Sequence, residues 1–233
     1  MSQEIKNIPY HVGIIMDGNR RWARAKGLPT LEGHRRGYDK VKKVGRWCKD
    51  RGVKILTVWA FSTENWKRSE EEVNYLMNLL KFAMSKGEID QLHKDRIKVQ
   101  VIGQKERLSE GLQKLIIEAE ERTKDNKEGV LNLAISYGGR ADILQAIKNI
   151  INKNISADQV EEETVGQNLW TAGMPDPDLI IRTSGELRTS GFLTWQSAYS
   201  ELHFCSNHWP DFSEKDLDEA LADYARRQRR FGV

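Results

Sequence analysis

Residues 11 to 24 read HVGIIMDGNRRWAR, a short apolar run that leads directly into a cluster of charged side chains. The run from Val12 to Met16 is typical of a strand covered on both faces, and Asp17-Gly18-Asn19 ends it. Asp17 is therefore expected at the carboxyl end of a strand, which is where open α/β sheets bind ligands. The arginine-rich segment that follows can begin a helix, and the free N–H groups at a helix start favour a phosphate.

Taken alone, this pattern also has a simpler interpretation. Asp17 would cap the next helix and the arginines would form a solvated face, and both arrangements are common. Two further segments favour a ligand site instead, because each of them follows a strand in the same way.

Composition limits the class of protein. The chain has 233 residues, 39% of them hydrophobic, which is enough for one core, so we expect a single domain spanning 1-233. The net charge of +3 is nearly balanced, so a nucleic-acid partner is not expected. Cys48 and Cys205 form neither a CxxC pair nor a zinc pattern, and no apolar run approaches about eighteen residues. We therefore expect a reduced, cytoplasmic protein without a membrane span.

Predicted strands and helices alternate along the chain. Strands are expected at 12–16, 54–61, 97–101, 130–135, 178–181 and 201–204. Helices are expected at 37–48, 69–80, 108–119, 143–151, 192–200 and 213–227, with capping boxes at Ser69 to Glu72 and at Ser156 to Gln159. This alternation predicts an α/β fold with a mainly parallel central sheet of six strands, surrounded by helices.

The loop after the second predicted strand is rich in polar groups. It carries Ser62, Thr63, Glu64, Asn65, Trp66 and Arg68. A hydroxyl, an amide and a guanidinium can jointly hold a diphosphate. The alternative, a polar connection anchored by Trp66, stays open at this point.

The loop after the fifth predicted strand repeats one motif. Residues 182 to 191 read RTSGELRTSG, which places Arg182 and Arg188 at equivalent positions among hydroxyls and glycines. Arginine offers forked donors to phosphate oxygens, and glycine lets the backbone come close to them. A solvated turn would also use Ser, Thr and Gly, but it has little reason to repeat the arginine.

Three loops with arginines, hydroxyls and the carboxylate of Asp17 are thus expected at one sheet edge. Because Mg²⁺ prefers one or two carboxylates together with phosphate oxygens, this set predicts Mg²⁺ and a diphosphate substrate. The sequence contains neither a P-loop nor a dinucleotide fingerprint, which argues against nucleotide chemistry.

The same residues resemble a known family, the cis-prenyltransferases, and within it the bacterial undecaprenyl diphosphate synthases. The similar segments are HVGIIMDGNRRWA, AFSTENWKR, SYGGR, DLIIRTSGELRTSGFLTWQSAYSEL and the ending RRFGV, in family order and over nearly the whole chain. The resemblance implies a homodimer that condenses isopentenyl diphosphate onto an allylic diphosphate, expected to be farnesyl diphosphate, to form cis double bonds. It also implies an apolar tunnel and peripheral contact with the inner membrane face for product release.

The resemblance assigns a role to each motif residue. Around the allylic diphosphate it places Asp17 with Mg²⁺, then Gly18, Asn19, Arg20, Arg21 and His34, with Trp22 along the prenyl chain. Around the reacting ends it places Ser62, Thr63, Glu64, Asn65, Trp66 and Arg68. For the diphosphate of isopentenyl diphosphate it implies Arg182, Arg188, Thr189 and Ser190, with Glu201 completing the metal site.

The family role of Asn65 as a proton acceptor is chemically uncomfortable, because a carboxamide is not a useful base. We interpret Asn65 as an orienting residue and leave open whether a diphosphate oxygen takes the proton. Two rival functions also remain: a non-catalytic partner subunit, and a synthase that stops at a farnesyl-length product. The presence of Asp17, Asn65 and Glu201 argues against the first.

Product length is expected to depend on Ala60, which by family analogy lines the tunnel beside its entrance. A small residue there leaves the path open, so we expect a product of about undecaprenyl length. The terminal segment 230–233 resembles a family element that lies near the dimer contact, and it is expected to support the neighbouring subunit's site.

Overall fold

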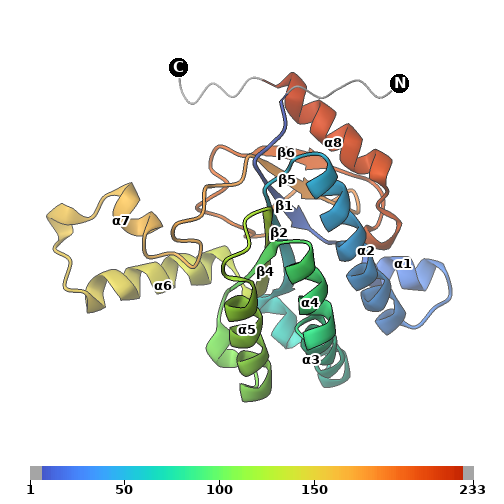
Figure 1. Ribbon diagram of the computed structural model, residues 1–233, viewed down its shortest axis with the longest axis horizontal. Coiled ribbons are helices and arrows are strands. Elements are labelled where there is room, and N and C mark those ends of the chain that lie inside the picture. The colour runs from blue at the N-terminus through green and yellow to red at the C-terminus, as the bar shows by residue number, and fades with distance from the viewer. Residues whose placement is uncertain (1–6, 228–233) are drawn as a thin grey trace.

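The computed structural model describes residues 7–227, and a six-stranded sheet with helices packed against it forms its centre (Figure 1). The strand order is β3-β4-β2-β1-β5-β6, and all neighbouring strands are parallel. The strands are β1 (His11–Ile15), β2 (Ile55–Ser62), β3 (Ile97–Ile102), β4 (Gly129–Tyr137), β5 (Leu179–Arg182) and β6 (Glu201–Phe204). The predicted fold class is confirmed, and the third predicted strand lies at a sheet edge.

The helices connect the strands as the alternation predicts. The α-helices are α1 (Asn19–Ala25), α2 (Thr30–Asp50), α3 (Glu70–Ala83), α4 (Lys86–Lys94), α5 (Glu110–Thr123), α6 (Gly139–Asn152), α7 (Glu162–Gly166) and α8 (Glu214–Arg226). Short 3₁₀ turns are η1 (Thr63–Lys67), η2 (Lys105–Arg107), η3 (Ala157–Gln159) and η4 (Trp209–Asp211). Ser156 and Gln159 form the predicted capping box at the start of η3.

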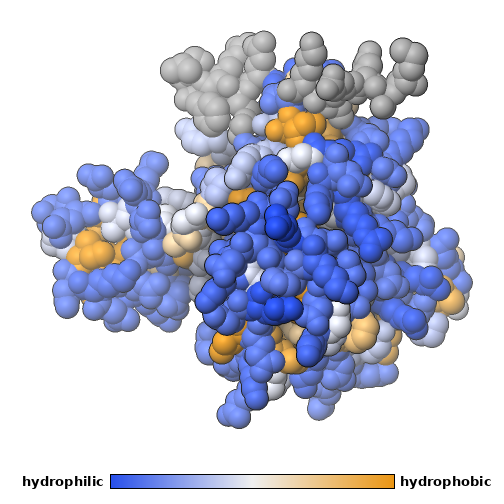
Figure 2. Space-filling model, viewed as in Figure 1, coloured by the Kyte–Doolittle hydropathy of each residue, from blue (hydrophilic) through white to orange (hydrophobic). Residues whose placement is uncertain are grey.

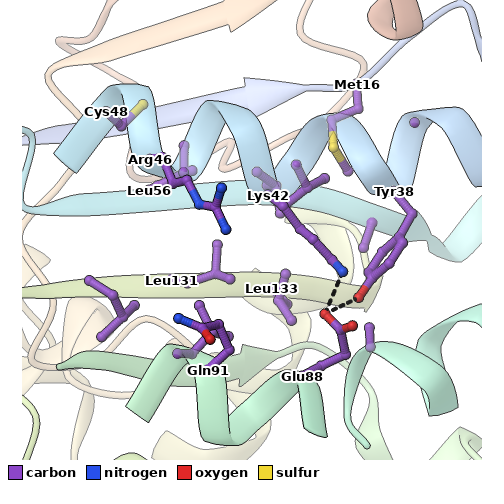
Figure 3. Close-up of a pocket in the computed structure, with 18 of the residues that line it drawn as sticks. Met16, Tyr38, Lys42, Arg46, Cys48, Leu56, Glu88, Gln91, Leu131 and Leu133 are labelled. Atoms are coloured by element: carbon purple, nitrogen blue, oxygen red, sulfur yellow. Dashed lines mark hydrogen bonds and ion pairs between the residues drawn. The ribbon is translucent and has the colours of Figure 1, made fainter. Parts of the chain in front are cut away.

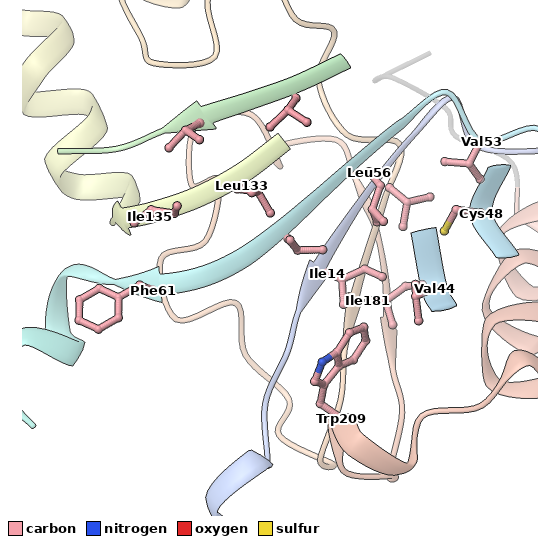
Figure 4. Close-up of a cluster of buried hydrophobic side chains, with 14 of the residues drawn as sticks. Ile14, Val44, Cys48, Val53, Leu56, Phe61, Leu133, Ile135, Ile181 and Trp209 are labelled. Carbon is pink, nitrogen blue, oxygen red and sulfur yellow. The ribbon is translucent and has the colours of Figure 1, made fainter. Parts of the chain in front are cut away.

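The two faces of the sheet are covered differently. Side chains alternate along each strand, so Ile14 and Ile181 point into a large cluster with α2 and Trp209 (Figure 4), whereas Ile15 and Ile180 point into a smaller one. All five residues of β1 are buried, in agreement with the prediction of a strand covered on both faces.

The helix predicted at 192–200 is wrong. Residues 191–199 form consecutive turns, and the φ angles of Ser190 and Leu193 are positive, at 53° and 46°. An α-helix cannot contain such residues. Burial offsets the strain at Leu193, which is fully buried beside Phe192 in the smaller cluster. Phe192 and Leu193 thus cover the second face of the sheet.

The chain changes direction around β1. From β1 it builds β2, β3 and β4 on one side of the sheet and then crosses to β5 and β6 on the other. Ligands in open α/β sheets bind outside the carboxyl ends of the strands at such a switch point. Asp17 and the loop after β5 both lie there.

A buried polar column crosses the sheet at the amino end of β1. His11 is 1% exposed; its Nδ1 donates to the Pro175 carbonyl at 2.7 Å, and its Nε2 accepts from Thr57 Oγ1 at 2.7 Å. Asn132 Nδ2 donates to the same hydroxyl at 3.1 Å. Burial lowers the pKa of His11 from 6.5 to about 4, so the ring is neutral in the folded protein.

This buried histidine predicts a loss of stability in acid. His11 is protonated below about pH 6.5 in the unfolded chain, but only below about pH 4 in the folded chain. The free energy of unfolding is therefore unaffected by His11 above pH 6.5, and it falls as the pH drops from 6.5 to 4. At pH 5 the expected loss is about 2 kcal/mol relative to pH 7.5. Urea unfolding of the wild type and of His11→Gln at both pH values measures it. An equal pH dependence in both proteins would contradict the assignment.

Within residues 7–227, none of the helices is both long enough and apolar enough to cross a membrane. The predicted terminal element at 230–233 lies outside the described residues.

Candidate active site

Two of the three predicted loops meet directly at Asp17. Its Oδ2 accepts from Arg182 Nη2 at 2.9 Å, and its Oδ1 lies 3.3 Å from Arg21 Nη2. The backbone N–H of Asp17 donates to Thr183 Oγ1 at 2.9 Å, which ties the loop after β1 to the loop after β5. The sheet edge thus brings together the carboxylate and the arginines that the sequence predicted there.

The carboxylate of Asp17 is ionised at neutral pH. Partial burial by itself raises the pKa of Asp17, but the Arg182 hydrogen bond and the charges of Arg21 and Arg182 outweigh this effect and lower it. Its side chain is 29% exposed, so a ligand can reach it. A charged, accessible carboxylate between two guanidiniums suits a site for a metal and a phosphate ester.

Gly18 makes the turn from β1 into α1. Its φ is 99°, and a Cβ at this position would overlap Ser184 Oγ, which is hydrogen-bonded to His208 Nδ1 at 2.7 Å. Only glycine combines this conformation with such a close approach. Gly18, and not Asp17, is the N-cap of α1, so the simpler interpretation of Asp17 as a helix cap does not hold.

Glu72 connects the loop after β2 to α1 and α2. Its Oε1 accepts from His34 Nε2 at 2.9 Å and from Arg68 Nη1 at 2.8 Å, and Arg20 Nε lies 3.9 Å away. Burial lowers the pKa of His34 despite the hydrogen bond to Glu72, so His34 is neutral and its Nε2 carries the proton that it donates.

The sequence pattern predicted a different role for Glu72, as the last residue of a capping box that begins at Ser69. In the predicted capping box its backbone N–H does donate to Ser69 Oγ at 3.4 Å, but its side chain turns away from the helix end to Arg68 and His34. The i, i+4 spacing of Arg68 and Glu72 is the signal that could have identified this pairing. The structure thus places a buried carboxylate among three of the predicted substrate-binding residues.

Asn65 holds the turn after β2. Its Oδ1 accepts from the Ser62 backbone N–H at 3.0 Å, so the amide oxygen is engaged. Thr63 Oγ1 donates to Glu64 Oε1 at 3.0 Å on the exposed side of the same turn. The geometry supports an orienting function for Asn65 rather than proton acceptance.

Trp66 anchors this turn to the sheet. Its Nε1 donates to Ser136 Oγ at 2.9 Å, and its ring packs edge-on against Phe61, with the centroids 5.0 Å apart. The guanidinium of Arg107 lies 4.9 Å from the ring centroid. The interpretation of Trp66 as an anchor is therefore consistent with the structure.

The repeated motif after β5 places its two arginines differently. Arg182 is 5% exposed and donates to Asp17 and, at 2.8 Å, to Ser190 Oγ. Arg188 is 59% exposed and pairs with Glu186, which also holds Arg21 at 2.7 Å. The backbone carbonyl of Thr189 accepts from Phe192 N at 3.0 Å. Arg182 therefore supports the loop from within, while Arg188 faces solvent and can bind an anion.

A largely apolar cavity of about 470 Å³ begins at His34, beside the Glu72 cluster (Figure 3). Asn19 and His34 line it at the site end, and the buried Oδ1 of Asn19 has no partner within the described residues. Its walls are formed by α2, α3, α4, β2 and β4, and they include Met16, Val58, Ala60, Leu76, Leu80, Leu131 and Leu133. Trp22 is buried, with Lys26 Nζ 5.3 Å from its ring centroid, and it does not line this cavity.

Glu201 does not lie beside Asp17 in this chain. It begins β6 opposite Leu179, which pairs with Val12, so it lies at the amino end of the strands, roughly 15 Å from Asp17 along the strand direction. Its Oε2 accepts from Arg227 Nη1 at 2.7 Å. The expectation that Glu201 completes the metal site is therefore not supported within one chain.

The donor set at Asp17 still fits Mg²⁺. Residues 7–227 contain no cluster of three or more His, Cys, Asp or Glu side chains that could hold a metal by themselves. Mg²⁺ is commonly held by a single carboxylate together with substrate phosphates and water, and Asp17 is charged and accessible. The neighbouring arginines would neutralise the remaining phosphate charge.

Comparison with known proteins agrees with this geometry. Residues 15–232 match the family model described as putative undecaprenyl diphosphate synthase. The isoprenyl transferase of Clostridium perfringens is 51% identical over 97% of this chain and 90% of its own length. The farnesyl-diphosphate-specific ditrans,polycis-undecaprenyl-diphosphate synthase of Legionella pneumophila strain Paris is 46% identical, covering 97% and 96%. The crystal structure of lavandulyl diphosphate synthase from Lavandula x intermedia with dimethylallyl diphosphate has a TM-score of 0.92 at 38% identity, covering 99% and 100%.

Proposed function

The chain belongs to the undecaprenyl diphosphate synthase family and is a prenyltransferase of the cis-prenyl diphosphate synthase type, and we propose that it elongates farnesyl diphosphate with isopentenyl diphosphate in a Mg²⁺-dependent reaction. The proposed product is a cis-polyprenyl diphosphate of about undecaprenyl length, a lipid carrier precursor, made by a single domain.

One observation carries this proposal. The ionised carboxylate of Asp17, paired with two guanidiniums, lies between Met16 and Asn19 in sequence, and both of these residues line a cavity whose walls are largely apolar. A diphosphate with a long hydrocarbon tail is complementary to that combination, because the charged head and the apolar tail each find a matching surface. Neither half of the site alone would distinguish such a substrate from a free phosphate or a fatty chain.

The allylic diphosphate is assigned to the loop after β1 and to the Glu72 cluster. Arg20 and Arg21 are each about two-fifths exposed and can turn toward its oxygens. Glu72 keeps His34 and Arg68 in place beside them. Mg²⁺ held by Asp17 would supply a Lewis acid that stabilises the leaving diphosphate.

The chemistry itself requires little covalent participation by the protein. The allylic C–O bond breaks, and its electron pair leaves with the diphosphate, whose charge the arginines stabilise. The double bond of isopentenyl diphosphate then forms the new C–C bond, and the resulting cation loses a proton. We assign that proton to an oxygen of the departing diphosphate, since the amide oxygen of Asn65 is already occupied.

Isopentenyl diphosphate is assigned to the loop after β5. Arg188 supplies the accessible guanidinium, and Arg182 holds Ser190 and Asp17 in position. Thr189 lies between Arg188 and Ser190 in the sequence. This arrangement would place the second diphosphate next to the first, as condensation requires.

Arg188→Ala is therefore expected to raise the Michaelis constant for isopentenyl diphosphate at least tenfold and to change that for farnesyl diphosphate much less. Arg188→Lys should recover little, because an ammonium lacks the forked donors of a guanidinium. Steady-state kinetics with each substrate varied in turn measure both constants. An equal rise in the two constants would contradict the assignment.

A homodimer is proposed from the surface of α6, which projects away from the sheet together with α7 (Figure 1). Leu144, Ile147 and Ile151 share one face of α6 and are 58%, 44% and 66% exposed. Apolar patches also show on this arm in Figure 2, where most of the surface is hydrophilic. Such a stripe is typical of a protein interface. Sedimentation analysis of the wild type tests the proposed homodimer, which should sediment with twice the mass of one chain.

A shorter product is the second candidate, because the lavandulyl diphosphate synthase structure was solved with the five-carbon dimethylallyl diphosphate. The apolar lining of the cavity along β2 and β4 is the reason that we favour the longer one. Incubation with farnesyl diphosphate, labelled isopentenyl diphosphate and Mg²⁺, followed by chromatography of the products, decides between them. No incorporation of label would refute the proposed function. The proposed location is the cytoplasm, with peripheral contact at the inner membrane face where an apolar product can leave.

A further inference from the structure

Helices α2 and α4 both line the cavity and face each other across it (Figure 3). We call the line along which they approach each other the seam. Glu88 of α4 joins them. Its Oε2 accepts from Tyr38 Oη at 2.8 Å and pairs with Lys42 Nζ at 2.7 Å. Tyr38 and Lys42 are four residues apart on α2, so they lie on one face, and Lys42 Nζ is also 5.0 Å from the Tyr38 ring centroid.

This contact can open without unfolding either helix. The side chains of Lys42 and Glu88 are 42% and 25% exposed. Ion pairs with this much solvent access contribute little to stability and exchange readily with water. At the far end of the seam, Lys49 Nζ donates to the Asp95 carbonyl at 3.0 Å. This hydrogen bond keeps the ends of α2 and α4 connected when the contacts of Glu88 with Tyr38 and Lys42 break.

Open space lies along the seam. Gly45 of α2 and Gly87 of α4 both line the cavity, and a Cβ built on either would meet no atom within 4 Å. Gly87 is also exposed, so the cavity reaches the surface beside Glu88. Glycine inside a helix costs stability relative to alanine, and neither position has the positive φ that would require it.

The lining changes character at this seam. The inner walls are aliphatic, whereas Lys42, Arg46 and Gln91 form a polar rim between α2 and α4. A hydrocarbon chain confined by the inner walls would therefore meet a polar boundary there, held shut by Glu88. Further growth would require that boundary to open.

We propose that the α2/α4 seam is a side portal of the cavity and that Glu88, by bridging to Tyr38 and Lys42, is a specificity-determining residue for product length. This inference rests on the proposed elongation reaction. While the bridge is closed, the growing prenyl chain stays within the cavity and elongation ends when the space is filled. When the bridge is open, the chain end passes through the seam and elongation continues.

Glu88→Ala should lengthen the products by at least one isoprene unit, while the rate of the first condensation changes less than twofold. Glu88→Gln, which keeps an acceptor for Tyr38 but loses the ion pair, should give a smaller shift in the same direction. Gly45→Leu fills the open space beside the bridge and should shorten the products. Purified full-length proteins, farnesyl diphosphate and labelled isopentenyl diphosphate with Mg²⁺ suffice, and the chain lengths are read by chromatography after dephosphorylation.

Asp90→Ala is the matched control. Asp90 lies on α4 two residues after Glu88 and forms a comparable exposed ion pair, but with Arg122 of α5. The products of Asp90→Ala should have the same chain lengths as those of the wild type. A wild-type distribution from Glu88→Ala, or equal lengthening by Asp90→Ala, would overturn the portal. A wild-type protein that incorporates no isopentenyl diphosphate would instead refute the proposed function, so the two failures are distinguishable.

Discussion

Asp17→Asn is expected to lower turnover by on the order of a thousandfold while leaving the fold intact. The amide has the same shape as the carboxylate and can still accept from Arg182, so the link between the loops after β1 and β5 should survive. What the variant loses is the negative charge that Mg²⁺ needs. Because the side chain is partly exposed and lies outside the hydrophobic clusters, little packing is disturbed.

The measurement is steady-state turnover with Mg²⁺, together with circular dichroism and thermal unfolding. Glu118→Gln, an exposed carboxylate on α5 that lies 4.0 Å from Lys114, is a suitable control and should keep full activity. Wild-type activity should disappear with EDTA and return with added Mg²⁺. If Asp17→Asn turned over normally, or if EDTA had no effect, the metal site would have to lie elsewhere.

The strands and loops that surround the site could be predicted from the sequence because they depend on local patterns. A buried apolar run followed by Asp17-Gly18 identifies a strand and its carboxyl end, and the same logic identified the loops after β2 and β5. In a parallel sheet all these ends lie at one edge, so Asp17 and Arg182 were expected at the same edge, whereas their direct contact depends on β1 and β5 being neighbours in the sheet.

Other features depend on contacts between distant segments, which no local pattern reveals. The carboxylate of Glu72 could cap its own helix, yet it accepts a hydrogen bond from His34, which lies 38 residues earlier in the sequence. The segment at 192–200 was predicted as a helix, but the burial of Phe192 and Leu193 against the sheet determines its conformation. Glu201 was placed by resemblance, whereas its position follows from the register of β6 against β5.

Ala60→Leu is expected to shorten the products by one isoprene unit or more. Leu56, Val58 and Ala60 alternate along β2 and all line the cavity, as the predicted side-chain alternation requires. The register of β2 against β4 shifts between Trp59 and Phe61, so Ala60 lies at a bulge, where a strand can redirect a side chain. A leucine at this position would occupy space in the upper part of the cavity.

The burial of hydrocarbon in the cavity determines the direction of this effect. Burying an isoprene unit of five carbons gains roughly 4 kcal/mol at about 0.8 kcal/mol for each carbon group, and forcing extra carbons into a filled cavity costs about 1–3 kcal/mol. A leucine at position 60 therefore removes the gain for the last units added but not for the first, so the first condensation should persist while later ones fail. Chromatography of the dephosphorylated products measures the shift, and Ala157→Leu in the exposed turn η3 is the control. If Ala60→Leu gave the wild-type distribution, or if the wild type itself stopped after one condensation, the cavity beside β2 would not be what limits chain growth.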